Sequence, residues 1–206
     1  SLFGHHFNMP NRSETSGYIE NVGSNYWFTY GDTLFIGINH NEATKDGIIS
    51  TNDFIEEAIK ENRNAKWKIL CTHWPFYQPK ANGAGGIRDA RFYNMEGYDD
   101  ILADNGIDLA ITAHDHFYFS SYPMYKGIKD INNFTTSTSS DGAATSTLTK
   151  SAQDKKTVYL ALGTTGWLYD DYNGLSKDED YMAYADTTAY RKSNNATVYH
   201  TFFTTI

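Results

Sequence analysis

Short apolar runs recur along the chain between longer polar stretches, and they predict a series of strands. The first two runs, 26–30 and 33–39, flank Gly31-Asp32 and are expected to pair as a hairpin. The second of them is almost wholly apolar, which is typical of a strand buried on both faces. Further strands are predicted at 67–72, 107–112, 158–162 and 197–204.

Two segments between these runs carry the helical period instead. One helix is expected to start near Ser50 or Thr51, because the apolar residues between 54 and 59 recur every three to four positions. A second should run from about 94 to 105 and end at Gly106, since glycine favours the end of a helix. The order strand, helix, strand, helix, strand predicts an α/β architecture.

The remaining segments are polar or rich in glycine, and we expect them to lack regular structure. Residues 1–25 and 169–195 are predicted to be irregular, 81–86 a glycine-rich loop, and 132–156 an exposed loop. The chain of 206 residues begins without Met and ends on a strand-like run. We therefore expect both ends to be cuts through a longer protein, with 1–206 as part of a single domain.

Composition excludes several classes of protein. The net charge is −8 with no basic stripe, so a nucleic-acid scaffold is a poor candidate partner. No run of about 18 apolar residues occurs, so no membrane-spanning segment is expected. Cys71 is the single cysteine, which excludes an intrachain disulfide, and we expect it to be a small buried residue. Few cysteines with many Asn, Thr and Tyr suit a secreted or cell-envelope protein.

Three histidines follow directly on predicted strands. His73 comes after one strand, and His114 and His116 come after the next. Sites in open α/β sheets form at the carboxyl ends of strands, and neutral imidazole suits zinc, iron and manganese. A lone histidine at a strand end is usually only hydrogen-bonded, and His-x-His pairs also occur in cupins. The residues by themselves therefore leave a metal site and ordinary histidines as open alternatives.

The two strand exits resemble known motifs. Leu70-Cys71-Thr72-His73 resembles the Val-x-x-His motif of calcineurin-like metallophosphoesterases, and Ala113-His114-Asp115-His116 resembles their Gly-His-x-His motif. The closest likeness is to bacterial relatives of the purple acid phosphatases. Flanking stretches resemble the family too, including Phe7-Asn8-Met9-Pro10-Asn11 and Gly163-Thr164-Thr165-Gly166. The resemblance covers about residues 3 to 205.

The resemblance implies a fold, an activity and a set of ligands. The fold would be a two-sheet sandwich with flanking helices, of which 1–206 supplies mainly the second, C-terminal half. The activity would be hydrolysis of a phosphate ester by a binuclear centre of Fe, Zn or Mn with a metal-bound hydroxide. His73 and His114 would bind one metal and His116 the other. Asp115 could orient a ligand imidazole or simply be exposed, and the two alternatives are equally open.

Three further residues are candidates for contact with substrate. They are His40, Trp74 and Tyr118. His40 follows the strand at 33–39, although a plain loop histidine is the simpler interpretation. Trp74 stands where the family often has a second histidine, and Tyr118 follows the histidine pair.

The sequence also departs from the family. The upstream Asp, Gly-Asp and Gly-Asn-His motifs that supply carboxylates, an Asn ligand and a proton donor do not occur, so no catalytic residue is assigned. His5 and His6 are expected in an exposed turn instead, and His200 in a strand. Ala113 replaces the usual Gly before the pair, and Ser120 aligns with a family Arg.

Three alternatives to a working enzyme stay open. The chain could be a ligand-binding module with an incomplete metal site, in which its Tyr and Trp hold a sugar or peptide. It could be only a folding fragment, and a cupin-like site is a weaker rival. A half domain would expose a face, so we expect self-association or completion by the missing N-terminal half.

Overall fold

The computed structural model describes most of the N-terminal two thirds of the chain and short parts of the rest. The described residues are 6–13, 25–39, 45–73, 75–81, 84–87, 98–113, 118–138, 140, 144–151, 153–162, 175–176 and 182–186. The predicted strand at 197–204 lies outside them, as do His5 and His200.

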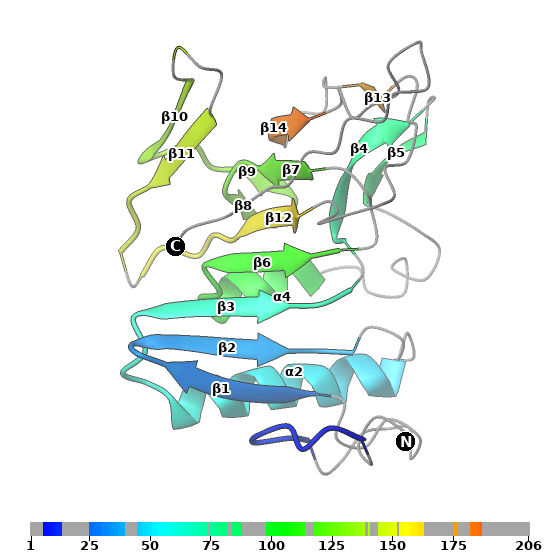
Figure 1. Ribbon diagram of the computed structural model, residues 1–206, viewed down its shortest axis with the longest axis vertical. Coiled ribbons are helices and arrows are strands. Elements are labelled where there is room, and N and C mark those ends of the chain that lie inside the picture. Colours follow the sequence, from blue (N-terminus) through cyan, green and yellow to red (C-terminus); the bar gives the residue numbers. More distant parts are fainter. Residues whose placement is uncertain are drawn as a thin grey trace.

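A seven-stranded sheet forms the centre of the described structure (Figure 1). Its strands, in spatial order, are β1 (Tyr26–Tyr30), β2 (Thr33–Gly37), β3 (Trp67–Cys71), β6 (Leu109–Thr112), β12 (Val158–Leu162), β7 (Tyr118–Ser121) and β14 (Met182–Asp186). The four strands β2, β3, β6 and β12 run parallel, whereas β1 and β7 run antiparallel to their neighbours. The carboxyl ends of the parallel strands therefore meet at one edge of the sheet, on the right in Figure 1.

Two helices cover one face of this sheet. Helix α2 (Lys45–Glu61) connects β2 to β3, and α4 (Tyr98–Asp104) lies between β3 and β6 in the chain. Both lie behind the sheet in Figure 1, as right-handed crossovers in one direction require. No helix among the described residues has the length and apolarity needed to cross a membrane.

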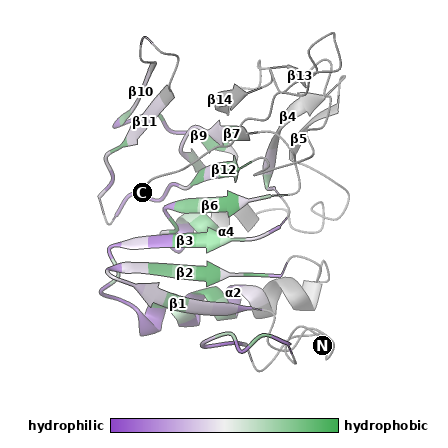
Figure 2. Ribbon diagram, viewed as in Figure 1, coloured by the Kyte–Doolittle hydropathy of each residue, from purple (hydrophilic) through white to green (hydrophobic). Residues whose placement is uncertain are grey.

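The hydrophobic core lies between these helices and the sheet. Ile36, Leu70 and Ala110 stand in register on neighbouring strands, so their side chains share one face. They are buried in a single cluster with Ile55 of α2 and Leu102 of α4. Figure 2 shows hydrophobic residues concentrated in the same central strands and in the inner side of α2.

The opposite face of the sheet is apolar but less covered. Phe28, Phe35 and Ile69 stand in register there, and the rings of Phe28 and Phe35 stack at 5.0 Å. Phe28 is 39 % exposed and Trp67 44 % exposed. No described helix lies over this face, which is turned toward the reader in Figure 1. The sheet thus has one packed face and one aromatic face on which Phe28 and Trp67 are partly exposed.

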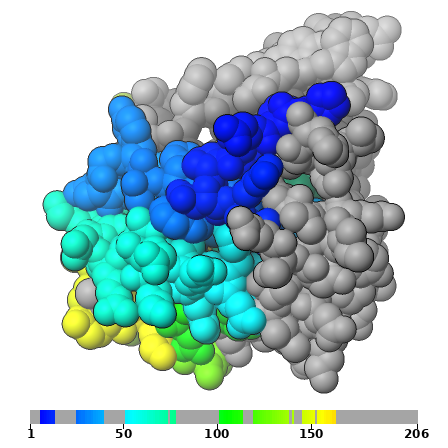
Figure 3. Space-filling model, turned by 90° about the horizontal axis from the view of Figure 1, so that it is seen from below, coloured from blue at the N-terminus to red at the C-terminus, as the bar shows by residue number. Residues whose placement is uncertain are grey.

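The N-terminal segment protects the outer edge of the sheet. Residues 6–13 lie against the edge strand β1, as the dark-blue atoms of Figure 3 show. The Asn11 side-chain amide donates to the Trp27 carbonyl at 3.1 Å, and the Ser13 N–H donates to the Asn25 carbonyl at 2.8 Å. These bonds occupy the Trp27 and Asn25 carbonyls near the edge strand, which would otherwise be available to a strand of another chain.

Three small sheets stand outside the main one. They are β13 (Leu175–Ser176) with β4 (Tyr77–Ala81) and β5 (Ala84–Ile87), β8 (Met124–Tyr125) with β9 (Ile128–Lys129), and β10 (Phe134–Thr138) with β11 (Ala144–Leu148). The predicted hairpin at Gly31-Asp32 is confirmed, and Gly31 has the positive φ of 59° that a tight turn needs.

Several predicted elements need correction. The loop predicted at 81–86 belongs to the pair β4–β5, and the loop at 132–156 contains the pair β10–β11. Strands β13 and β14 lie within the segment 169–195 that was predicted to be irregular. Helix α2 starts at Lys45, earlier than Ser50 or Thr51, because Thr51 is buried inside the helix rather than capping it.

Candidate metal centre

The exits of β3 and β6 stay paired beyond the strands themselves. The Thr72 N–H donates to the Ile111 carbonyl at 3.0 Å, and the Ala113 N–H donates to the His73 carbonyl at 3.0 Å. The structure therefore brings His73 directly beside the residue that precedes His114. His114, Asp115 and His116 lie outside the described residues.

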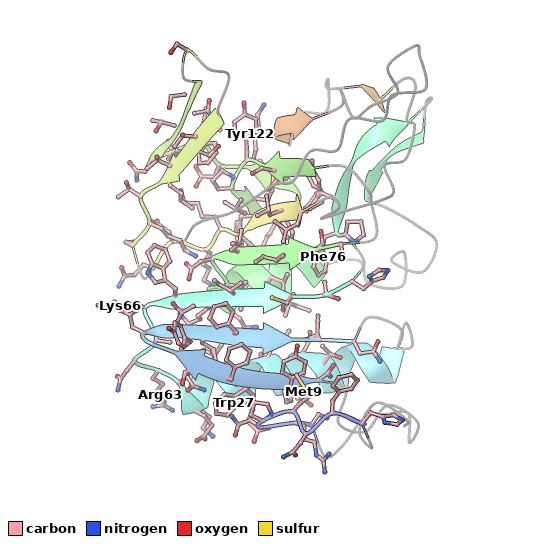
Figure 4. All side chains as sticks on the ribbon, in the orientation of Figure 1. Met9, Trp27, Arg63, Lys66, Phe76 and Tyr122 are labelled. Atoms are coloured by element: carbon pink, nitrogen blue, oxygen red, sulfur yellow. The ribbon has the colours of Figure 1, made fainter. Side chains whose placement is uncertain are left out.

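His73 is exposed at this carboxyl edge, on a segment that is firmly anchored behind it. Phe76 and Tyr77, which follow shortly after, are both buried. Their rings pack edge-on against Tyr159 of β12, at 5.4 Å and 4.8 Å. Figure 4 shows Phe76 close to the carboxyl ends of the central strands. Such packing fixes the position of the imidazole without hiding it from solvent.

The segment that follows β2 is held at the same edge by a hydrogen bond to a buried asparagine. The Ile38 N–H donates to the Cys71 carbonyl at 3.0 Å. The Asn39 N–H donates to the side-chain oxygen of Asn25 at 2.8 Å, and Asn25 is only 3 % exposed. These bonds hold the residue before His40 at the edge, although His40 itself lies outside the described residues.

A phenol and a thiol line the aromatic face just below His73. Tyr26, Gly37 and Cys71 stand in register on three neighbouring strands. Burial raises the pKa of Tyr26, and the nearby Cys71 raises it further. Burial also raises the pKa of Cys71, which is half-buried rather than fully buried as expected. Both groups are therefore neutral at ordinary pH, and neither adds charge beside the imidazole.

One hydroxyl at this edge has no protein partner. The Oγ1 atom of Thr72 is buried and makes no hydrogen bond, although it stands directly before His73. A buried hydroxyl without a partner is costly, so such atoms usually serve a bound water or ligand. The sequence analysis did not predict that Thr72, Asn25 and Phe76 contribute to this edge. The polar character of Thr72 and Asn25 next to predicted strands was the available signal, and Phe76 had none.

The donors at this edge fit a metal in part. An exposed imidazole on a rigid strand exit is a suitable ligand for a transition metal. Within the described residues, however, no group of three or more His, Cys, Asp or Glu gathers closely enough to hold an ion. The described structure thus presents one exposed imidazole, that of His73, beside the residue that precedes His114.

The structure places the other candidate residues as follows. Tyr118 begins β7 and pairs with Leu162, so its backbone lies at the carboxyl edge; nothing is described of its side chain. Trp74 lies outside the described residues. His6 is exposed as expected, but its backbone is helical rather than a turn. Ser120 is buried within β7, and its hydroxyl donates to the Ser121 carbonyl, so it does not replace the family Arg in the site.

Fold and site together define an α/β protein with His73 at the carboxyl edge of a parallel sheet. The family model of calcineurin-like phosphoesterases matches residues 2–118. This match covers more than half of the chain and includes both histidine motifs, so the chain belongs to the calcineurin-like phosphoesterase family. Among curated proteins, none matches.

The chain is similar to two solved structures. The first, purple acid phosphatase PPD1 from seeds of yellow lupin (Lupinus luteus), shares this fold, with a TM-score of 0.54 and 14 % identity. The alignment covers 79 % of this chain and 26 % of the lupin chain. A second is GAP50, the anchor in the inner membrane complex of Plasmodium, with a TM-score of 0.46, 15 % identity, and coverage of 81 % and 45 %. This chain thus spans about a quarter of the length of the lupin chain and less than half of that of GAP50.

Proposed function

We propose that this chain is the histidine half of a binuclear metallophosphoesterase, a hydrolase of phosphate monoesters or diesters. The observation that carries the proposal is the pairing of the two strand exits, through the Thr72 and Ala113 N–H groups. It brings the start of the His114–His116 motif beside His73 in a chain of a phosphoesterase family. His73 and His114 would bind one metal and His116 the other, with Fe, Zn or Mn as the ions.

Two adjacent metals in such a site would activate water and stabilise charge on the phosphoryl oxygens. The chain itself supplies the His73 imidazole on an anchored strand exit, which would keep this ligand in place before metal arrives. The orphaned Thr72 hydroxyl is suited to hold an ordered water or a substrate oxygen at this edge. His40, Trp74 and Tyr118 are our candidates for substrate contact, and Tyr118 shares the edge through its backbone.

The carboxylate ligands would come from the missing N-terminal half of the domain. The aromatic face around Phe28, Phe35 and Trp67 is the surface on which that half would pack. A sheet face of this apolarity normally packs against another layer. The chain alone would therefore self-associate, unless the missing half covers this face. We place the parent protein in the cell envelope or outside the cell.

Metal binding tests the ligand assignment. We expect the chain alone to bind Zn²⁺ or Mn²⁺ weakly, at less than one ion per chain after dialysis against a mild chelator. His73→Ala, His114→Ala and His116→Ala should each lower this binding further in a calorimetric titration. His6→Ala is the matched control, because His6 is an exposed histidine outside the proposed site. Equal binding by wild type and His73→Ala would refute the assignment.

A ligand-binding module is the second candidate, because aromatic rings lie on the open sheet face. Tyr30 and Trp67 share that face at the row of Thr33, and they are 80 % and 44 % exposed. Exposed aromatic rings can hold a sugar or peptide. Two tightly held metals per chain would exclude this alternative. Saturable quenching of tryptophan fluorescence by an oligosaccharide, without metal, would favour it.

A further inference from the structure

The hairpin β10–β11 is built mainly from Thr and Ser. Its strands contain no charged residue and no proline, in a chain of net charge −8. Five consecutive pairs join the strands without a bulge, from Phe134↔Leu148 to Thr138↔Ala144. The three central pairs consist only of Thr and Ser, and the side chains of these residues are exposed.

Two ion pairs with buried lysines anchor the hairpin, although the aspartate of one of them, Asp130, is 38 % exposed. Lys150, 6 % exposed, binds Asp108, 14 % exposed, at 2.7 Å at the amino end of β6. Lys156, 3 % exposed, binds Asp130 at 3.0 Å and the Asn132 carbonyl at 3.0 Å. Burying charges costs free energy unless they are paired, so this root is a specific arrangement. It lies at the amino end of the parallel strands, away from His73.

The ring of Tyr122 fixes the first residue of the hairpin as well. Tyr122 and Phe134 pack edge-on at 5.6 Å. The hairpin beyond this point projects from the main sheet (Figure 1) and adds little to the core. A short element that is strongly anchored yet contributes few buried residues is suited to present its own surface.

No described strand pairs with the outer edge of β10 or of β11. Natural proteins usually protect such edges with charges, prolines or bulges, because an open edge invites another strand. This hairpin has none of these protections in its described strands. Its edge is therefore competent for strand addition by a partner.

We propose that the β10–β11 edge is a self-association surface, on which a second copy of this chain adds its own hairpin as an antiparallel strand. A two-fold contact must be complementary to itself. Hydroxyl groups meet this condition, since each can donate and accept, and Thr–Ser pairs across strands are favourable. The same pairing already joins Thr136 to Ser146 within the hairpin. The absence of charge also makes this the place where two acidic chains meet with least repulsion.

The proposal is independent of the phosphoesterase assignment, because the hairpin and His73 lie at opposite ends of the parallel strands. A contact of one strand from each copy is small, so its dissociation constant should be on the order of 100 µM. Thr136→Lys and Ser146→Lys change the centres of the two strands. In a two-fold antiparallel pair, each would set two lysines against one another.

Sedimentation velocity between about 10 and 500 µM, the range around a dissociation constant of this order, tests the proposal. Wild type should form dimers reversibly, and at least one hairpin variant should weaken association more than tenfold. Asn64→Lys is the matched control, because it adds the same charge at an exposed turn elsewhere and should dimerise like wild type. A wild type that stays monomeric, or hairpin variants that associate as wild type does, would overturn it.

Hydrogen–deuterium exchange of the wild type guards against variants that do not fold. Amides of residues 134–148 should exchange more slowly at high than at low protein concentration. If their exchange does not depend on concentration, the hairpin edge is not the contact and the proposal fails.

Discussion

Gly37 has no room for a side chain, because the Tyr26 ring lies against its Cα atom. A Cβ atom at Gly37 would lie 2.5 Å from the Tyr26 ring, far inside contact distance. The φ of Gly37 is not positive, so the space occupied by Tyr26 is the constraint rather than the backbone. We expect Gly37→Ala to displace the ring and to lower the free energy of unfolding by about 1–2 kcal/mol. Urea denaturation measures this loss.

A double-mutant cycle separates the ring from other causes. In the Tyr26→Ala background, Gly37→Ala should be nearly neutral, because the clash no longer exists. If the glycine replacement costs the same free energy in both backgrounds, the Tyr26 contact does not explain the glycine.

Asp130 makes part of the stability dependent on pH. Burial alone would raise its pKa, but the Asn132 N–H and the Lys156 ammonium outweigh burial and hold the pKa below its usual value. A lowered pKa means that the unfolded chain binds more protons, so this stabilisation is present above about pH 4 and is lost as the pH falls through the folded pKa. Because the Asp130 carboxylate is 38 % exposed and partly screened by solvent, Asp130→Asn should cost only about 0.5–1 kcal/mol at pH 7.

The pH profile distinguishes this origin from a simple packing loss. The difference in unfolding free energy between wild type and Asp130→Asn should shrink when chemical denaturation is repeated at pH 3. A difference that stays constant from pH 7 to pH 3 would show that the carboxylate charge does not matter there.

At the scale of elements, Lys150 and Asp108 connect the hairpin to the main sheet. Asp108 also accepts from the Lys68 N–H at 2.8 Å, so its carboxylate joins two strands and the hairpin root. Lys150→Met would leave this buried carboxylate without its cation. We expect a loss of about 2–4 kcal/mol in unfolding free energy.

Removing both charges should restore part of that loss. In Asp108→Asn/Lys150→Met, no unpaired carboxylate is left, while the amide oxygen still accepts from Lys68. Thermal unfolding of the three variants checks this order. A double variant less stable than Lys150→Met alone would contradict the role assigned to the pair.

The elements that could be predicted from the sequence are those whose secondary structure follows from their own pattern of apolar residues and glycines. The runs at 26–30 and 158–162 form strands with the predicted bounds, and Gly106 ends α4 with a φ of 71°. The strands of 132–156 were missed because Thr and Ser suit both loops and strands. The two strands pair locally with each other, and their root is held by the ion pair of Lys150 with Asp108, a residue far away in the sequence.

The site was predictable to the same extent. Apolar runs ending in histidine indicated the carboxyl edge, and the structure puts His73 there. The contacts that hold this edge in place could not be predicted. Asn25 accepts a hydrogen bond from the Asn39 N–H, and the Tyr159 ring packs against Phe76, both between residues far apart in the sequence. His40, Trp74, His114 and His116 lie outside the described residues, so their roles stay predictions.

At the scale of the whole molecule, the two faces of the sheet give the final prediction. One face is sealed by α2 and α4, while the other bears Phe28 and Trp67 half-exposed. If the aromatic face receives the missing half of the domain, Phe28→Thr/Trp67→Thr should leave the fold intact, since both side chains already contact water. The variant should be more soluble than wild type and should bind less of a hydrophobic dye.

Whether the Phe28→Thr/Trp67→Thr variant can still bind the missing half of the domain tests the role of the aromatic face. When the upstream segment of the parent protein is fused or added, wild type should gain tightly bound metal and hydrolysis of a phosphate ester, because carboxylate ligands then meet His73. The double variant should gain neither, since its face no longer holds the added half. Ile128→Thr/Ile131→Thr is the matched control, as these isoleucines are 70 % and 56 % exposed elsewhere. If the sheet-face variant is completed as readily as this control, the aromatic face is not the joining surface, and the carboxylates must approach the histidines from another side.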